Sequence, residues 1–180
     1  MALLTLNEYK VFANITGILA DARLTAIINS ANQWFLTKLK RNIEEKSQEE
    51  YYDGDNTSEL LLRDYPITEL TELKIDDTLI TATDYATYYS SGIIKMLYGI
   101  FSGGIQNVYV KYKSGFNPVP NDIKMAISEL VSKKYESFDK KGNSFSSEAF
   151  MGGSLVFKDS DITEFMKMVL DNYRKKGKPN

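Results

Sequence analysis

The chain has 180 residues, of which 43% are hydrophobic and 26% are charged, as expected of one globular domain or of a domain with an inserted subdomain. Its 22 basic and 24 acidic residues nearly balance, which disfavours a strongly basic nucleic-acid binder. It contains no cysteine and no histidine, which excludes disulfides, cysteine nucleophiles, zinc sites with the usual ligands and histidine-dependent triads.

The N-terminal segment, residues 1–48, is expected to be helical. Thr5 and Glu8 have the spacing of a capping box, which predicts a short helix over about 6–13. Asp21 is a suitable N-cap for a second helix over about 21–46. Apolar residues recur there at steps of three and four, as on one side of a helix: Leu24, Ile28, Ala31, Phe35, Leu39 and Ile43.

The middle segment, residues 49–117, has short runs of Leu, Ile, Val, Tyr and Thr between closely spaced turn signals. The run 108–113 alternates, which places Val108, Val110 and Tyr112 on one face and Tyr109, Lys111 and Lys113 on the other. Because no helix-length period separates the runs, a parallel sheet is disfavoured. We expect five or six short antiparallel strands joined by hairpins.

The C-terminal segment, residues 118–180, is expected to return to helix. Asn121 is a suitable cap for a helix with apolar residues on one side, namely Ile123, Ile127, Leu130, Tyr135 and Phe138. Another helix is expected to begin at Asp161. The predicted fold is therefore α+β: a mainly helical core of three or four helices, with the antiparallel segment 49–117 inserted into it.

Candidate chemical sites are weak. The run 53–59 alternates oxygen ligands that suit Ca²⁺, but it lacks the glycine and glutamate that an EF-hand loop needs, and a hairpin turn explains the same residues. Neighbouring carboxylates on a strand point to opposite faces, and no phosphate-binding glycine loop is present. We expect no catalytic residue, no cofactor, no metal and no enzyme activity. A two-carboxylate hydrolase is the weakest alternative.

Tyrosine is unusually frequent, with 12 residues, most of them in the middle segment. Cross-strand packing is our first explanation, a protein interface the second, and base stacking the third. The third gives an alternative function, a nucleic-acid-binding module that uses the surface of Tyr109, Lys111 and Lys113. The charge opposes it, because residues 47–120 carry 11 acidic and only 5 basic side chains.

A segment without periodicity, 139–158, is rich in large apolar residues. Such long segments are usually functional or disordered, and a disordered linker would be poorer in Phe, Met and Leu. We expect it to order against a partner rather than fold back on the chain's own core. Trp34 is either core or an anchor against a neighbouring subunit. The candidate partner-interface residues are Trp34, Lys140, Lys141, Phe145, Phe150, Met151, Leu155 and Phe157.

No apolar run reaches the roughly 20 residues that cross a bilayer, and no secretory signal is visible at the N-terminus. We therefore expect a protein that works inside the cell, without export and without a membrane partner.

A loose series of turn and strand signatures runs through residues 4–138: the opening segment 4–10, the helix 21–46, and the segments 51–54, 60–67, 70–76, 83–85, 91–93, 108–115 and 120–122. In this order they resemble the head-tail connector (head-completion adaptor) proteins of long-tailed bacteriophages. The resemblance implies a structural virion protein at the head-tail interface, made in the host cytoplasm. It further implies a ring of about a dozen copies under the portal protein. Such a ring extends the DNA channel, lets DNA pass without sequence-specific binding, and docks a stopper or tail-completion protein.

Overall fold

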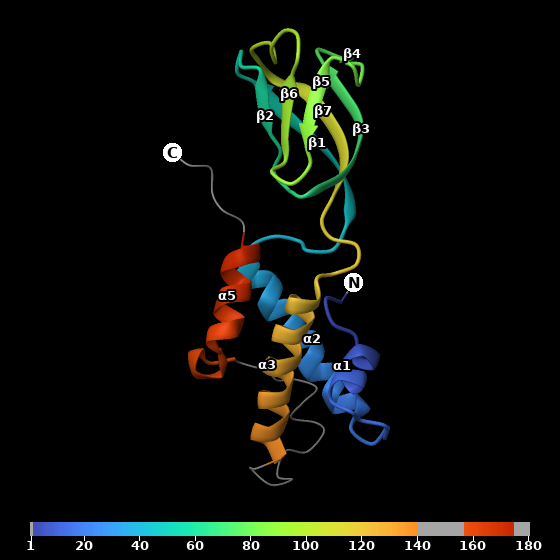
Figure 1. Ribbon diagram of the computed structural model, residues 1–180, viewed down its shortest axis with the longest axis vertical. Coiled ribbons are helices and arrows are strands. Elements are labelled where there is room, and N and C mark those ends of the chain that lie inside the picture. The colour runs from blue at the N-terminus through green and yellow to red at the C-terminus, as the bar shows by residue number, and fades with distance from the viewer. Residues whose placement is uncertain (1, 140–156, 175–180) are drawn as a thin grey trace. The chain divides into compact units, whose positions relative to one another are not determined.

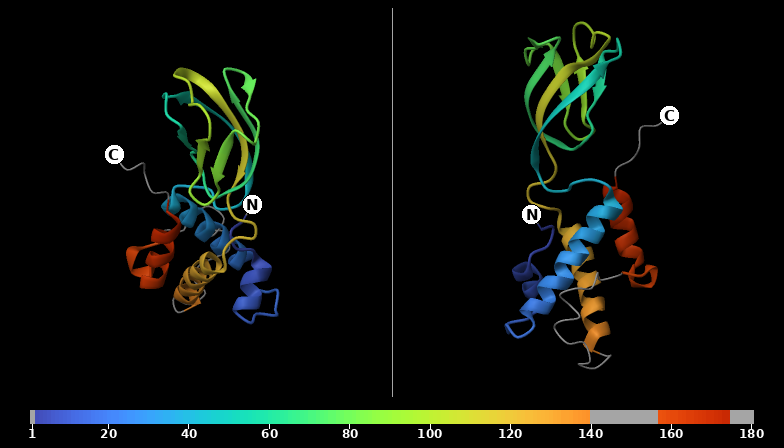
Figure 2. Two further views of the ribbon diagram at one scale, coloured as in Figure 1. Left: turned by 45° about the horizontal axis from the view of Figure 1, so that its top comes forward. Right: turned by 180° about the vertical axis from the view of Figure 1, so that it is seen from behind.

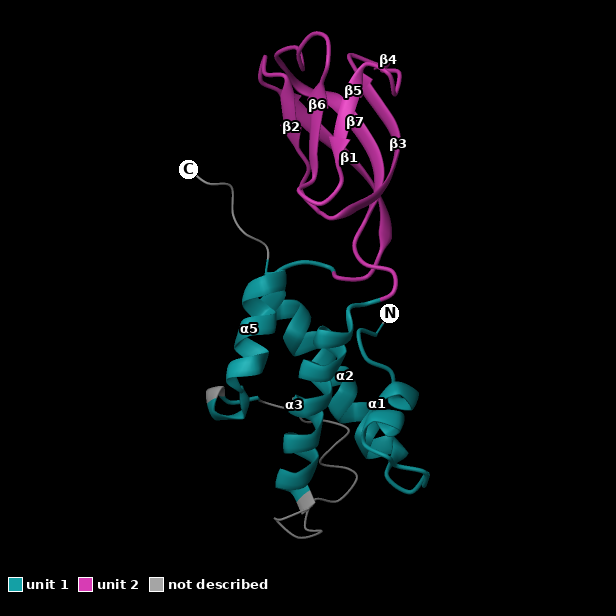
Figure 3. Cartoon of the chain, in the orientation of Figure 1, with its two compact units in different colours: residues 1–42, 119–180 teal, residues 43–118 magenta. Residues whose placement is uncertain are grey.

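The computed structural model describes residues 2–139 and 157–174. The chain divides into two compact units, unit 1 with residues 1–42 and 119–180 and unit 2 with residues 43–118 (Figure 3). The chain leaves unit 1 once and returns to it, and the predicted insert 49–117 lies within unit 2. The α+β class is confirmed. The description as mainly helical is wrong, because the strands are comparable in extent to the helices.

Unit 1 is built from helices in the described residues: α1 (Leu6–Phe12), α2 (Asp21–Leu39), α3 (Asn121–Asp139), the short 3-10 helix η1 (Asp159–Asp161) and α5 (Glu164–Tyr173). Helices α2 and α3 pack together, and α1 and α5 flank this pair on opposite sides (Figures 1 and 2). Its core is formed by fully buried apolar side chains of α2 and α3, among them Leu24, Ile27, Phe35, Ile123, Ile127 and Leu130. None of the helices in these parts of the chain is long and apolar enough for a membrane span.

Three helix starts differ from their predictions, and one agrees. Asn121, predicted as a cap, is the first residue of α3. The capping box is confirmed, because the Thr5 hydroxyl accepts from the Glu8 N–H at 3.3 Å and the Glu8 carboxylate accepts from the Thr5 N–H at 2.8 Å. Asp21 is the first residue of α2 and not its cap, since its carboxylate pairs with Lys10 at 2.8 Å. Helix α5 begins at Glu164 and not at Asp161, because the Thr163 hydroxyl caps it.

Helix α2 ends at Leu39, seven residues before the predicted end at 46. Lys40 takes a left-handed conformation with φ 55° and donates its N–H to the Leu36 carbonyl, which closes the helix. Residues from Lys46 onward pair with a distant strand. The prediction failed because Ile43, which is buried, fits the apolar spacing of the helix although it lies in the connection to the sheet.

Unit 2 contains seven strands, one or two more than predicted: β1 (Lys46–Gly54), β2 (Glu59–Leu61), β3 (Ile67–Ile75), β4 (Thr78–Leu79), β5 (Tyr85–Tyr88), β6 (Ile93–Met96) and β7 (Gly104–Ser114). All the pairings between them are antiparallel, as predicted. They form one sheet of order β1-β7-β3-β4 and one of order β2-β6-β5 (Figure 1). A shared apolar core lies inside, with Leu62, Leu73, Ile94, Phe101, Val108 and Val110 almost fully buried.

The central strand β7 confirms the predicted alternation. Val108, Val110 and Tyr112 are completely buried. The intervening residues lie on the outer face of the sheet, where they are only partly exposed: Tyr109, Lys111 and Lys113.

Candidate functional site

Two of the eight predicted interface residues, Trp34 and Phe157, lie in the described part of the chain. Their rings are 6.0 Å apart, and the Trp34 ring also meets Phe35 edge-on at 5.3 Å. Phe157 is 9% exposed, so most of its side chain is already covered by its own unit. Trp34 remains partly exposed, with the Lys38 ammonium 5.4 Å from its ring. A role of this pair in a partner interface stays a prediction.

The other six predicted interface residues lie outside the described residues: Lys140, Lys141, Phe145, Phe150, Met151 and Leu155. Their assignment to a partner interface therefore also stays a prediction.

The outer face of β7 and its neighbours is the surface on which the nucleic-acid alternative depends. Its lysines make ion pairs at 2.6–2.7 Å: Lys111 with Glu49 and Lys113 with Glu69 across neighbouring strands, and Lys74 with Glu72 within β3. The hydrogen bond from Lys111 is the main reason why the pKa of Glu49 is lowered. A nucleic-acid phosphate would have to displace these carboxylates, so this face offers less attraction to DNA than its lysines alone suggest.

A tyrosine–carboxylate network connects β1, β7 and the chain after β2. The side chain of Glu50 is 16% exposed and accepts hydrogen bonds from the hydroxyls of Tyr52 and, at 2.8 Å, Tyr112. The Tyr52 hydroxyl also accepts from the Arg63 N–H at 2.9 Å. Burial, together with hydrogen bonding, raises the pKa of both tyrosines well above the ordinary value, so both stay protonated donors at neutral pH. The network therefore holds the strands together.

The acidic run 53–59 forms a turn that is tied to the β6–β7 loop. Asp53 accepts from the Gln106 N–H at 2.7 Å, Asp55 from the Thr57 N–H at 3.1 Å, and Asn56 from the Gly103 N–H at 2.8 Å. The bond from Thr57 to Asp55 is the local contact of a turn residue, whereas the other two bonds attach the turn to the β6–β7 loop and to the start of β7. Within 2–139 and 157–174, no three acidic side chains lie close enough together to hold a metal ion.

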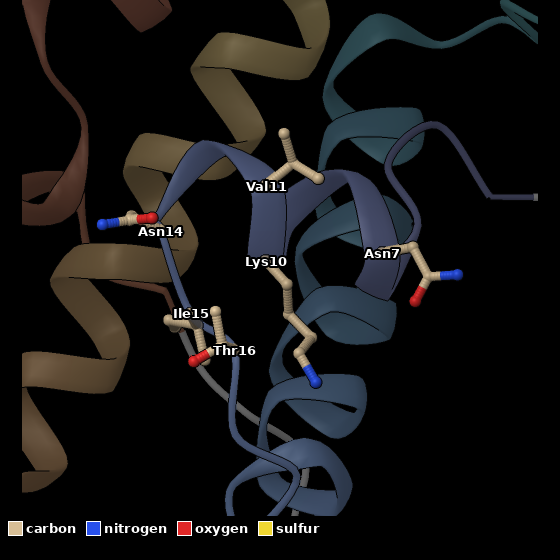
Figure 4. Close-up of a pocket in the computed structure, with 6 residues that line it drawn as sticks. All are labelled: Asn7, Lys10, Val11, Asn14, Ile15 and Thr16. Carbon is tan, nitrogen blue, oxygen red and sulfur yellow. The ribbon is translucent and has the colours of Figure 1, made fainter.

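The sequence analysis missed an apolar surface at the connection between α1 and α2. It consists of Val11, Phe12, Ile18 and Leu19, with exposed fractions of 83%, 53%, 76% and 103%, and we call it the apolar knob. Residues 11–20 contain no charged side chain, which is the signal that could have pointed to it. A pocket of about 440 Å³ adjoins the knob and is lined by Asn7, Lys10, Val11, Asn14, Ile15 and Thr16 (Figure 4).

A second pocket, of about 310 Å³, lies on the opposite side of unit 1, between the C-terminal parts of α2 and α5. We call it the α2–α5 pocket, and its lining residues are Lys38, Lys167, Leu170, Asp171 and Arg174. Leu170 and the methylene chains of the basic residues supply apolar surface, and the charged groups stand at the ends of those chains.

Comparison with known proteins matches almost the entire chain to a protein family. The family model described as "Head completion protein" matches residues 2–176. A head completion protein of Escherichia phage T5 is 21% identical over 175 residues, which cover 97% of this chain and 99% of that protein.

Solved structures from gene transfer agent (GTA) particles have a similar fold. A chain in the neck of the empty particle, computed with C6 symmetry, gives a TM-score of 0.61 at 15% identity and covers 98% of this chain and 94% of its own. A chain in the neck of the native particle, computed with C12 symmetry, gives a TM-score of 0.58 at 15% identity. The match covers 98% of this chain and 93% of that chain. At this identity the likeness concerns the fold.

Proposed function

Because the chain belongs to the head completion protein family, a family of structural head-tail connectors, we propose that about a dozen copies form a ring below the portal of a virion. In this proposal the ring extends the DNA channel and offers its other side to a stopper or tail-completion protein. The observation that carries it is the family match over residues 2–176, which spans both units and not just one of them.

The symmetry of the structural relatives supports a ring. Those chains come from particle necks that were computed with sixfold and twelvefold symmetry. A ring of identical copies requires heterologous contacts, in which one surface of a copy meets a different surface of the next. Unit 1 has distinct surfaces on its two sides, the apolar knob and the α2–α5 pocket, so it meets this requirement in principle.

The charge of unit 2 suits a wall beside passing DNA. Residues 43–118 include 13 acidic and 6 basic side chains, and five of the six basic ones form ion pairs within the unit. Surplus carboxylates repel phosphates, so DNA would move past such a surface without adhering to it. We propose that unit 2 contributes to the channel wall on this ground.

The test uses DNA-filled heads of the encoding phage that were made without this protein. Purified chain is added, unbound protein is removed by sedimentation, and the bound copies per head are counted on a calibrated gel and located by electron microscopy. The proposal expects about a dozen copies per head, all at the portal vertex, and none on heads that lack the portal. Failure to bind portal-bearing heads, or binding spread over the capsid, would refute it.

A further inference from the structure

The apolar knob gathers four exposed large apolar side chains within residues 11–19. Its four large side chains are each more than half exposed, and together they present on the order of several hundred Å² of apolar surface. On a monomeric protein a patch of this size commonly marks a contact site. Because residues 11–20 include no charged side chain, the knob itself carries no charged group that must lose its water when it is covered.

The knob is held in place by contacts on both sides of it. Lys10 pairs with Asp21 at 2.8 Å, which joins the helices on either side of the connection. Lys124 pairs with Glu8 at 2.6 Å and attaches α1 to α3. A contact surface that is ordered before binding loses less conformational freedom when the partner arrives.

The α2–α5 pocket has matching properties on the opposite side of the same unit. Its volume of about 310 Å³ is sufficient for one large apolar side chain. Leu170 offers an apolar contact, and the guanidinium of Arg174 suits the face of an aromatic ring such as that of Phe12, whereas Lys167 pairs with Glu164 at 2.7 Å. Knob and pocket cannot meet within one copy, because α1 and α5 lie on opposite sides of the α2–α3 pair (Figures 1 and 2).

We propose that the apolar knob of one copy inserts into the α2–α5 pocket of the next copy. An exposed apolar surface and a pocket at different places of one molecule form a heterologous contact, which repeats from copy to copy and closes into a ring when the rotation permits. This contact rests on the proposed ring and names the residues that would make it. Phe12 and Leu19 are its anchors, because a few well-packed residues supply most of the binding energy of an interface.

The first experiment measures self-association of the full chain by light scattering and sedimentation over a concentration series up to about 1 mM. The knob variant carries Phe12→Asp and Leu19→Asp, both at exposed positions, so the fold should survive. The pocket variant carries Asp171→Trp, which fills the pocket from another exposed position. Each is expected to weaken association at least 10- to 100-fold, the usual range for an interface anchor. Ile105→Asp, at an equally exposed apolar residue of unit 2, is the matched control and should associate like the wild type.

The second experiment mixes the two variants in equal amounts. Each should be monomeric alone, but the knob variant still has its pocket and the pocket variant still has its knob. The mixture is therefore expected to form a species of two chains and nothing larger. A mixture that stays monomeric would overturn the proposal, as would variants that associate like the wild type.

These outcomes separate the contact from the connector function. If the wild type associates and both variants do as well, the knob–pocket contact is wrong and a ring with other contacts survives. If the wild type stays monomeric throughout the concentration range, the contact is overturned, and binding to portal-bearing heads decides independently whether the connector function holds.

Discussion

The side chain of Asn32 attaches the N-terminal segment to α2 by hydrogen bonds to the Leu4 backbone. Replacing Asn32 tests how much these bonds stabilise the packing of α1, the helix that bears the knob. The side chain is 5% exposed. Its amide nitrogen donates to the Leu4 carbonyl at 3.0 Å, and its amide oxygen accepts from the Leu4 N–H at 3.1 Å. Leu4 is itself 2% exposed and lies directly before the cap of α1. The backbone of Leu4 therefore depends on Asn32 for both of these hydrogen bonds.

Asn32→Ala is expected to destabilise unit 1 by about 2–4 kcal/mol. Each lost neutral hydrogen bond contributes about 1 kcal/mol, and a buried N–H or C=O left without a partner costs about 1–3 kcal/mol. The lower end of the expected range applies if water enters the space left by the amide and bonds to Leu4.

The assay is urea unfolding followed by tryptophan fluorescence. Trp34 is the single tryptophan of the chain and lies two residues after Asn32 in α2, so its fluorescence reports on unit 1. Thr37→Ala is the control, because the Thr37 hydroxyl also makes one hydrogen bond, to the Gln33 carbonyl at 2.9 Å, but is exposed. The control should change stability by about 0.5 kcal/mol or less. If Asn32→Ala costs no more than Thr37→Ala, the argument about the Leu4 backbone is refuted.

Three further predictions concern acid stability, the strand network and DNA. Burial raises the pKa of Glu8, but hydrogen bonds from Lys124 and Thr5 outweigh it and leave the pKa below 4.5. The wild type should therefore be more stable than Glu8→Gln above pH 4.5, and this difference should vanish as the pH falls further. Urea midpoints of both proteins between about pH 7 and 3 measure it. Tyr112→Phe should destabilise unit 2 by about 1.5–3 kcal/mol because a hydrogen bond to the Glu50 carboxylate is lost; unchanged hydrogen-exchange protection in β7 would contradict this. Lys111→Glu should leave any retardation of DNA in a low-salt gel unchanged, since Lys111 is paired with Glu49. Retardation that this variant abolishes would favour the nucleic-acid alternative.

Local patterns predicted those parts of the fold that local interactions determine. The Thr5–Glu8 capping box needs only residues three apart, and the alternation along β7 needs only the two faces of a strand. The end of α2 could not be predicted in the same way. Glu49 and Lys111 are neighbours in space but far apart in sequence, and such pairing decides where the sheet begins.

The candidate site was less accessible to sequence analysis than the fold. Exposed contact surfaces follow no period, so residues 11–20 resemble an ordinary connection between two helices. The sequence analysis placed the interface in the segment 139–158 and at Trp34, where large apolar residues stand out by composition alone. The pocket opposite the knob is formed by the ends of α2 and α5, which only the tertiary arrangement brings together.

The charges of the two units provide a second way in which copies of the chain could attract one another, and salt separates it from the knob–pocket contact. Unit 1 includes 16 basic and 11 acidic residues, whereas unit 2 includes 6 and 13.

Attraction between such surfaces acts through water and weakens as the screening length falls from about 10 Å at 0.1 M salt to about 3 Å at 1 M. The knob has no charge between residues 11 and 20, so its burial depends on apolar surface and not on ion pairs. We therefore expect the association constant of the wild type to change less than about threefold between 0.1 and 1 M NaCl. A loss of tenfold or more would mean that the opposite charges of units 1 and 2, and not the apolar knob, bring the copies together.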